Sequence, residues 1–199
     1  LQPVEVERER LVNFLGDTLV IVNSYQARNE WNFRNSRVVW HGFDPSEFPP
    51  ATFEKGIVSP FGPLVISRPH YRGFFIYEAV FSNFPQQYMP ATLYVPEPDV
   101  LHTGNEYAVG RYQNYVNELR RYSVYFNPTL RSPMPRARGE AMICGLVTVS
   151  TQNHDVELFI KNGWNGFYSA DPDELRNYLL FLARNPQKTK EIGMRGRQT

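Results

Sequence analysis

The sequence lacks the features that most often assign a chain to a membrane, a nucleic acid or a disulfide-rich class. Its one cysteine, Cys144, provides neither an internal disulfide nor a Cys-x-x-Cys metal site, and its apolar setting (MICGL) predicts a buried structural thiol. No apolar run approaches the roughly 20 residues that span a bilayer, and the charged opening LQPVEVERERLV is unlike a signal peptide. The formal net charge of +1 provides no field that would attract nucleic acid. We therefore expect a cytoplasmic protein without a nucleic-acid partner.

Several common motifs of nucleotide-binding and hydrolytic enzymes are also absent. No Gly-x-Gly-x-x-Gly and no P-loop occurs, which argues against nicotinamide or ATP binding through those cradles, and the Gly-x-Ser-x-Gly of serine hydrolases is missing. The histidines at 41, 70, 102 and 154 lack the His-Glu-x-x-His spacing of zinc enzymes. We expect no metal site and no bound cofactor.

The amino-terminal part of the chain predicts two helices and two strands. Residues 4–15 have the pattern of an amphipathic helix, and the β-branched run TLVIV at 18–22 is typical of a buried strand. Asn23 and Ser24 are suitable N-cap residues for a helix over SYQARNEWNF. Residues 37–43 (RVVWHGF) predict another strand that ends on a turn.

The rest of the chain alternates regularly between strands and helices. Residues 44–62 carry four prolines and show no period, which indicates a connection between two bodies of structure. Beyond them we expect strands over 63–67, 91–95, 124–128, 146–150 and 166–169, with helices over 73–84, 105–122, 138–145 and 155–163 between them. Asp171 then caps a helix whose first residue is Pro172. This alternation predicts an α/β fold with a parallel sheet covered by helices on both faces.

Ligands of open parallel sheets bind beyond the carboxyl ends of the strands, so candidate site residues follow predicted strands. Three such segments, SRPHYRG (67–73), TLRSPMPRARGEAM (129–142) and STQNHD (150–155), are rich in cations and contain one central carboxylate, Glu140. Arginine matches phosphate oxygens and a carboxylate accepts both hydroxyls of a diol, so together they suit a ligand with phosphates and a ribose. The alternatives are solvated loop arginines and, for His154, a histidine that is simply hydrogen-bonded within the fold.

Residues 132–167, SPMPRARGEAMICGLVTVSTQNHDVELFIKNGWNGF, resemble the donor-binding domain of retaining glycosyltransferases of the two-domain GT-B fold. The group in question contains sucrose synthases and many bacterial mannosyl- and glucosyltransferases. WHGFDPSEF at 40–48 resembles the turn through which such enzymes enter the donor domain. The resemblance implies a Rossmann-like carboxy-terminal half of a GT-B fold over residues 37–199. Residues 1–36 would then be the end of an amino-terminal acceptor domain, most of which lies outside the chain.

The resemblance also implies roles for individual residues. Glu140 matches the second glutamate of the family's Glu-x7-Glu motif, which holds the nucleotide ribose, and Ser132 stands where the first glutamate would contact the sugar. Arg68 and Arg72 match the basic pair on the donor diphosphate, although three residues separate them where the family has four.

Other residues of the same segments are further candidates for donor contacts. His154 and Asp155 replace the glycine pair that often follows the strand VTVST, and with Asn153 they are candidates for sugar binding. Arg136 and Arg138 are candidates for additional phosphate contacts.

The sequence thus predicts a glycosyltransferase, specifically a hexosyltransferase. It would move a sugar from a nucleoside diphosphate sugar to a glycan or lipid-linked acceptor, with retention of configuration and a role in polysaccharide biosynthesis. The nucleotide sugar is a co-substrate, and peripheral membrane contact would come through the acceptor domain. The alternatives are a non-catalytic nucleotide-sugar binding module, which Ser132 favours, and a degenerate scaffold, against which Glu140 and the arginine pair argue.

Overall fold

The computed structural model describes residues 5–60, 69–93, 106–131 and 135–199. The strand predicted over residues 63–67 lies outside these ranges, as do Arg68 and Ser132. None of the described helices is long and apolar enough to cross a membrane.

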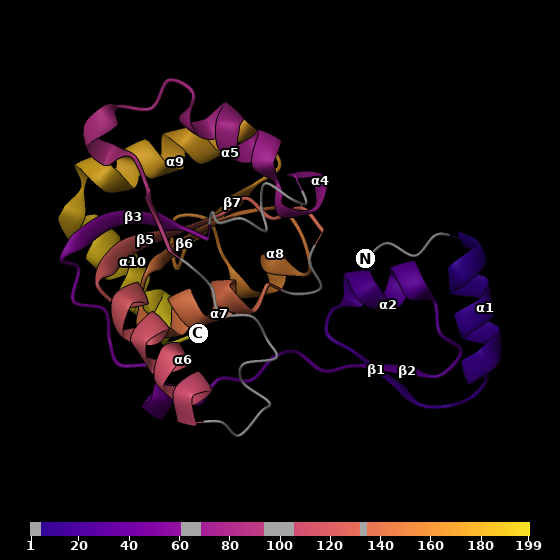
Figure 1. Cartoon of the computed structure of the whole chain (residues 1–199). Coiled ribbons are helices and arrows are strands. Elements are labelled where there is room, and N and C mark those ends of the chain that lie inside the picture. The colour runs from indigo at the N-terminus through magenta and orange to yellow at the C-terminus, as the bar shows by residue number, and fades with distance from the viewer. Residues whose placement is uncertain (1–4, 61–68, 94–105, 132–134) are drawn as a thin grey trace.

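A five-stranded parallel sheet forms the centre of the larger body of structure (Figure 1). Its spatial order is β4-β3-β5-β6-β7, with every neighbouring pair parallel. The strands are β3 (Lys55–Ser59), β4 (Ala91–Thr92), β5 (Tyr122–Asn127), β6 (Val147–Thr151) and β7 (Phe167–Ser169). The predicted α/β fold with a parallel sheet is confirmed.

The position of β3 corrects one prediction. Residues 44–62 were expected to be an irregular connection, but Lys55–Ser59 within them form strand β3, which lies between β4 and β5 in the sheet. The rest of that stretch contains a short 3-10 helix, Pro45–Glu47, and the buried ring of Phe48. The strand was not recognised because KGIVS is short and lies between prolines. Its pairing with β5, in which Ile57 faces Val124, identifies it as a strand.

Helices cover both faces of the sheet, as predicted (Figure 1). One face carries α5 (Phe74–Phe81) and α9 (Pro172–Arg184), and the other carries α6 (Glu106–Leu119) and α7 (Arg136–Cys144). The remaining elements of this body are α4 (Pro69–Arg72), the 3-10 helix η2 (Gln86–Tyr88), α8 (Val156–Phe159) and α10 (Pro186–Arg197).

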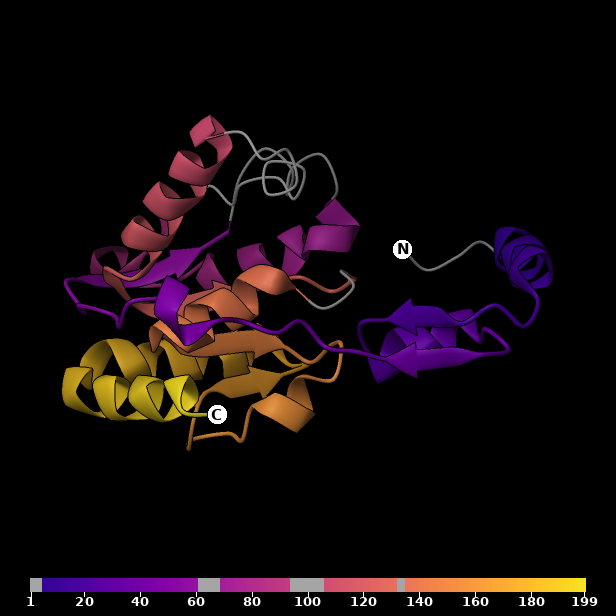
Figure 2. The same cartoon turned by 90° about the horizontal axis from the view of Figure 1, so that it is seen from below.

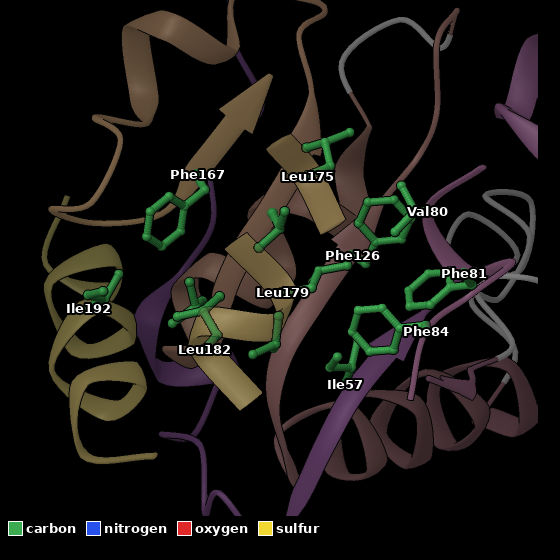
Figure 3. Packing of buried hydrophobic residues seen from close by; sticks show 13 residues of the cluster. Ile57, Val80, Phe81, Phe84, Phe126, Phe167, Leu175, Leu179, Leu182 and Ile192 are labelled. Atoms are coloured by element: carbon green, nitrogen blue, oxygen red, sulfur yellow. The ribbon is translucent and has the colours of Figure 1, made fainter. Parts of the chain in front are cut away.

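Alternating side chains of the strands divide the core into two apolar clusters. Ile57 and Phe126 face α5 and α9, where they pack against Phe81 and Leu179 (Figure 3). The adjacent Tyr125 points the other way, into the cluster formed with α6 and α7. Cys144 belongs to this second cluster and is fully buried, which confirms the prediction of a structural thiol.

The start of α9 was predicted correctly from the local sequence, whereas the end of α8 was not. Asp171 accepts a hydrogen bond from the backbone N–H of Asp173 at 2.8 Å and Pro172 begins α9, as predicted. The helix predicted over residues 155–163 was too long, because α8 ends at Phe159. The side chain of Asn165 binds both the carbonyl oxygen of Phe159 and the backbone N–H of Lys161, which holds the chain in a turn there.

The amino-terminal residues form a smaller unit to one side of the main body (Figure 2). It consists of α1 (Glu5–Leu15), β1 (Val20–Val22), α2 (Tyr25–Trp31) and β2 (Ser36–Val38), and β1 pairs with β2 in parallel. Ser24 caps α2 by accepting the N–H of Ala27, as predicted. β2 straddles the predicted domain boundary between residues 36 and 37.

The prediction of a buried strand at 18–22 was wrong for one side of β1. Ile21 is 57% exposed, and Val39 beside β2 is 55% exposed. They are exposed because β1 and β2 form a sheet of two strands only, whereas parallel sheets are normally covered on both faces. A shallow hollow of about 540 Å³ lies beside them, lined in part by Ala27, Trp31 and Trp40.

Candidate functional site

The strand order of the main sheet reverses between β3 and β5. From β3 the chain continues to β4 on one side, whereas β5, β6 and β7 extend on the other. Ligands of open parallel sheets bind at the carboxyl ends of the strands beside such a switch point. The described segments that follow these strands are α4 (Pro69–Arg72), residues 128–131 and residues 152–155. Apart from Pro128, they are parts of the three segments predicted from the sequence, 67–73, 129–142 and 150–155.

The segment after β3 packs directly on the segment after β5. The backbone N–H of Leu130 donates to the carbonyl oxygen of Tyr71 at 3.2 Å. Gly73 has a φ of 74°, and a Cβ at this position would lie 1.7 Å from the carbonyl oxygen of Pro128. Only glycine combines this left-handed backbone with so close an approach. The contact fixes Arg72 at the carboxyl end of β5.

Arg72 has a donor that the described part of the protein leaves unused. Its Nε is buried and has no hydrogen-bond partner among the described residues. Burial and then the charge of Glu140 raise the pKa of the Tyr125 phenol on β5, while the positive charge of Arg72 opposes that rise. Arg72 and Glu140 therefore both lie within electrostatic reach of Tyr125. An unpaired buried N–H costs free energy, which an anionic ligand would recover.

Glu140 lies on α7 with its carboxylate almost completely buried, at 3% side-chain exposure. Its Oε1 accepts from the Tyr112 hydroxyl at 2.7 Å and from Nε of Arg136 at 2.8 Å, and its Oε2 accepts from the Tyr115 hydroxyl at 2.9 Å. Among these partners Arg136 is the exposed one, with 44% of its side chain accessible. Arg136 is therefore the partner of the carboxylate that lies toward solvent, and it also donates to the Tyr112 hydroxyl at 3.3 Å.

The two tyrosines remain protonated donors throughout the neutral pH range. Burial raises the pKa of the Tyr112 phenol, and the charge of Glu140 adds to the effect. The same two causes, in the same order, raise the pKa of Tyr115 well above its usual value. These two residues were not among the candidates predicted from the sequence. The available signal was their spacing of three on α6, which places both on one face of the helix.

The connection out of the amino-terminal unit passes beside Glu140. A Cβ on Gly139 would come within 2.3 Å of the Phe43 ring, so this ring lies directly on α7. Burial lowers the pKa of His41, the positive charge of Arg136 lowers it further, and Glu140 opposes both. His41 is thus a neighbour of the Glu140 cluster that sequence reasoning missed.

Arg138, a candidate for phosphate contact, is buried and has protein partners instead. Its guanidinium donates to the carbonyl oxygen and to Oδ1 of Asn153, both at 3.1 Å, and to the carbonyl oxygen of His154 at 2.9 Å. Burial lowers its pKa to about 10. In this arrangement Arg138 fixes the segment that follows β6.

That segment, Asn153–Asp155, faces the amino-terminal unit. The Asn153 amide donates to the carbonyl oxygen of Thr129, which joins the segments after β5 and β6. Asp155 accepts from the backbone N–H groups of Tyr25 and Gln26 at 2.6 and 3.2 Å. The structure therefore brings these three candidates to the predicted edge, where their side chains contact protein groups.

The described residues contain no group of three or more His, Cys, Asp or Glu side chains that could hold a metal ion. The concentrated charge of this edge comes instead from Arg72, Arg136, Arg138 and Glu140.

No protein-family model matches the chain, and no curated protein matches it. Solved structures do match its fold. The structure of Anabaena HepE in complex with UDP and glucose is 16% identical with a TM-score of 0.70, covering 98% of this chain and 62% of that one. Sucrose-phosphate synthase from Thermosynechococcus elongatus is 17% identical with a TM-score of 0.71, covering 99% of this chain and 57% of that one.

A third structure is a single domain. The C-terminal domain of a group 1 glycosyl transferase, LpcC from Francisella tularensis, is 13% identical with a TM-score of 0.53 and covers 79% of this chain and 95% of that one. The chain thus spans less than two thirds of the length of HepE and nearly all of this isolated domain. Its larger body has the Rossmann-like α/β fold that forms one half of GT-B glycosyltransferases.

Proposed function

We propose that this chain contains the donor-binding domain of a retaining glycosyltransferase, which transfers a hexose from a nucleoside diphosphate sugar. The observation that carries the proposal is the placement of Arg72, with an unpaired buried Nε, and Glu140 at the switch-point edge of the sheet. An arginine donor and a carboxylate acceptor are the groups that a diphosphate and a ribose require. HepE, which shares the fold, was solved with UDP and glucose.

The proposed chemistry is electrostatic. When the bond between the sugar and the diphosphate breaks, negative charge grows on the leaving phosphate oxygens. Arg72, together with Arg68 outside the described residues, would neutralise this charge without a metal ion or cofactor. Fixed cations at a developing charge are among the largest contributions to catalysis. We assign no nucleophile to this chain.

Ribose binding to Glu140 requires a rearrangement of its ion pair. The carboxylate is occupied by Tyr112, Tyr115 and Arg136, and the two tyrosine hydroxyls belong to the helix beside it. Arg136 is 44% exposed and can swing outward only if the ribose hydroxyls replace it as donors to Glu140, because a buried carboxylate that loses a partner is otherwise destabilised. The released guanidinium would then be available for a donor phosphate, which is the role suggested for Arg136 by its position after β5.

The amino-terminal part of the chain is proposed to belong to the acceptor side of the enzyme. Residues 1–36 would be the end of an acceptor domain for a glycan or lipid-linked saccharide in cytoplasmic polysaccharide biosynthesis, and that domain would make any peripheral contact with a membrane. The exposed apolar side of β1 supports this assignment, because Ile21 lacks the cover that parallel strands normally have.

Calorimetric titration with UDP, GDP, ADP and their sugar conjugates tests the proposal. We expect saturable binding of one nucleotide, weakened at least about tenfold, or roughly 1.4 kcal/mol, in Arg72→Met and Glu140→Gln. Glu191→Gln, an exposed glutamate on α10, is the matched control and should bind normally. A folded chain that binds none of these nucleotides would contradict the proposal.

A non-catalytic nucleotide-sugar binding module is the second candidate. The observation that favours it is Ser132, which stands in the motif position where the resembling enzymes have a glutamate toward the sugar. Assays of donor-sugar transfer to added saccharides, with the same nucleotide that binds, separate the two candidates. Binding without turnover in a chain that includes the acceptor domain would support the module.

A further inference from the structure

We propose that Asp155 is a positioning residue that latches the amino-terminal unit onto the ligand-binding edge of the main sheet. The latch consists of Asn153–Asp155 on the sheet side, and of the first turn of α2 with Trp40 on the other side. Asp155 is not assigned to a ligand in this proposal, because its carboxylate is occupied by three protein donors.

The contacts of Asp155 are those of a carboxylate built into a helix end. It is 6% exposed and accepts from the N–H groups of Tyr25 at 2.6 Å and Gln26 at 3.2 Å, which belong to the first turn of α2. First-turn N–H groups have no partner within their own helix. Ser24 accepts a further one, from Ala27, so the cap of α2 is shared between its own N-cap and a residue about 130 positions later.

Trp40 makes the second connection between the two parts of the protein. Its indole Nε1 donates to Asp155 at 3.1 Å. Its ring packs edge-on against Tyr25 of α2, at 5.6 Å between centroids, and against Phe159 of α8, at 5.2 Å. Trp40 thus lies between the amino-terminal unit and the main body, with its one polar atom paired.

His154 extends the same contact. Its backbone N–H donates to Oε1 of Gln26 at 2.7 Å, and its Nδ1 lies 3.3 Å from the hydroxyl oxygen of Ser24. The side chains of both His154 and Asp155 are therefore directed at one short stretch, Ser24–Gln26. Figure 1 shows the consequence at the level of the fold, with α2 facing α8 at the edge of the main body.

The backbone conformation of His154 and Asp155 would suit glycine, so the presence of two side chains there indicates that these side chains are needed. His154 and Asp155 have φ values of 41° and 59°, in the left-handed region that non-glycine residues adopt at a cost. A glycine pair would adopt this backbone freely but would offer nothing to α2. The buried Arg138 holds the strained backbone through the carbonyl oxygens of Asn153 and His154.

The latch determines where the connection after β2 runs. Trp40 is held by Asp155, and the next residue, His41, lies within electrostatic reach of Arg136 and Glu140. Two residues later Phe43 packs on Gly139 of α7. Release of the latch would therefore disturb the surroundings of Glu140. This last consequence for donor binding rests on the proposed function, whereas the latch itself does not.

Hydrogen exchange of the whole 199-residue chain, without nucleotide, tests the latch. Asp155→Asn keeps the size of the side chain but turns an amide toward N–H donors. We expect amides of residues 20–38 to exchange at least about tenfold faster in this variant, with β5 and β6 unchanged. Trp40→Phe keeps an aromatic side chain, loses one of the three hydrogen bonds to Asp155 and should have a smaller effect on the same residues.

Asp173→Asn is the matched control, because Asp173 is an exposed carboxylate in the first turn of α9 and should leave residues 20–38 unchanged. Three results would overturn the proposal: unprotected amides of residues 25–31 in the parent chain, unchanged exchange of residues 20–38 in Asp155→Asn, or equal loosening of β5 and β6. Nucleotide titration of Glu140→Gln tests the proposed function separately, since this variant should keep the exchange pattern of residues 20–38.

Discussion

Gly73 and Pro128 touch through their backbones across the switch point of the sheet, where a Cβ on Gly73 would lie 1.7 Å from the carbonyl oxygen of Pro128. This contact joins the segments after β3 and β5, which carry the proposed donor site. We expect Gly73→Ala to lower the free energy of unfolding by at least about 2 kcal/mol, because a left-handed backbone and a backbone clash add together. Urea denaturation measures the effect.

Gly110→Ala provides the control for this change. Gly110 lies within α6 with no atom within 4 Å of an added Cβ, so alanine there should raise the free energy of unfolding by up to about 1 kcal/mol. Gly73→Ala should also weaken nucleotide binding, since Arg72 is the adjacent residue. Equal stabilities of the two variants would show that Gly73 and Pro128 are not in contact.

Tyr115→Phe tests the support of Glu140. The variant removes the only hydrogen bond described to Oε2 of this buried carboxylate, and we expect a loss of about 1 to 3 kcal/mol in stability. Tyr112→Phe should cost less, because Tyr112 is only partly buried and Oε1 keeps Arg136. Chemical denaturation of both variants compares them, and a larger loss in Tyr112→Phe would be inconsistent with the observed geometry.

The stability of the latch should depend on pH through His154. Burial lowers the pKa of His154 in the folded protein, and Arg138 adds to the effect while Glu30 opposes it. The unfolded chain therefore binds a proton more readily, so this contribution to stability is present above the ordinary histidine pKa of about 6.5 and is lost as the pH falls below it. His41, whose pKa is also lowered, acts in the same direction.

Melting temperatures at about pH 7.5 and about pH 5.5 measure this dependence. His154→Asn tolerates the left-handed backbone and does not titrate, so its melting temperature should fall less between these two pH values than that of the parent. His70→Asn, at an exposed histidine on α4, should behave like the parent. If the melting temperature of His154→Asn falls as much as that of the parent between these pH values, His154 is not a source of the pH dependence of stability.

Cys144 should be chemically inert in the folded protein. Burial raises the pKa of its thiol to about 12, and the thiolate is the reactive form. We expect a colourimetric thiol reagent to label Cys144 at the rate of unfolding at mildly alkaline pH, and immediately in denaturant. Rapid labelling without denaturant would show that the second core cluster is open to solvent.

Local sequence patterns predicted much of the fold because their physical causes are local. Asp171 and Pro172 begin α9, and Ser24 caps α2, since capping involves residues only two or three positions apart. β3 was missed within residues 44–62, because what makes KGIVS a strand is its pairing with β4 and β5. The end of α8 was missed because the side chain of Asn165 determines it.

The candidate site was predicted as a set of positions but not as a network. The resemblance selected Glu140 and Arg72, and the fold places both at the switch-point edge. Tyr112, Tyr115 and His41 were not selected: the spacing of the two tyrosines puts them on one helix face, but only the packing of α6 on α7 turns that face toward Glu140. Arg138 was predicted to contact phosphate but binds protein groups, because the sequence does not distinguish a buried arginine from an exposed one.

By itself the sequence determined the alternation of strands and helices, the caps and the residue types available at the ends of the strands. These follow from backbone preferences and from the period of apolar side chains. Only the tertiary structure decided how each polar group is used, because a hydrogen bond depends on which donor comes within about 3 Å. Asp155 shows the difference, since its three donors come from Tyr25, Gln26 and Trp40, more than 100 residues earlier in the chain.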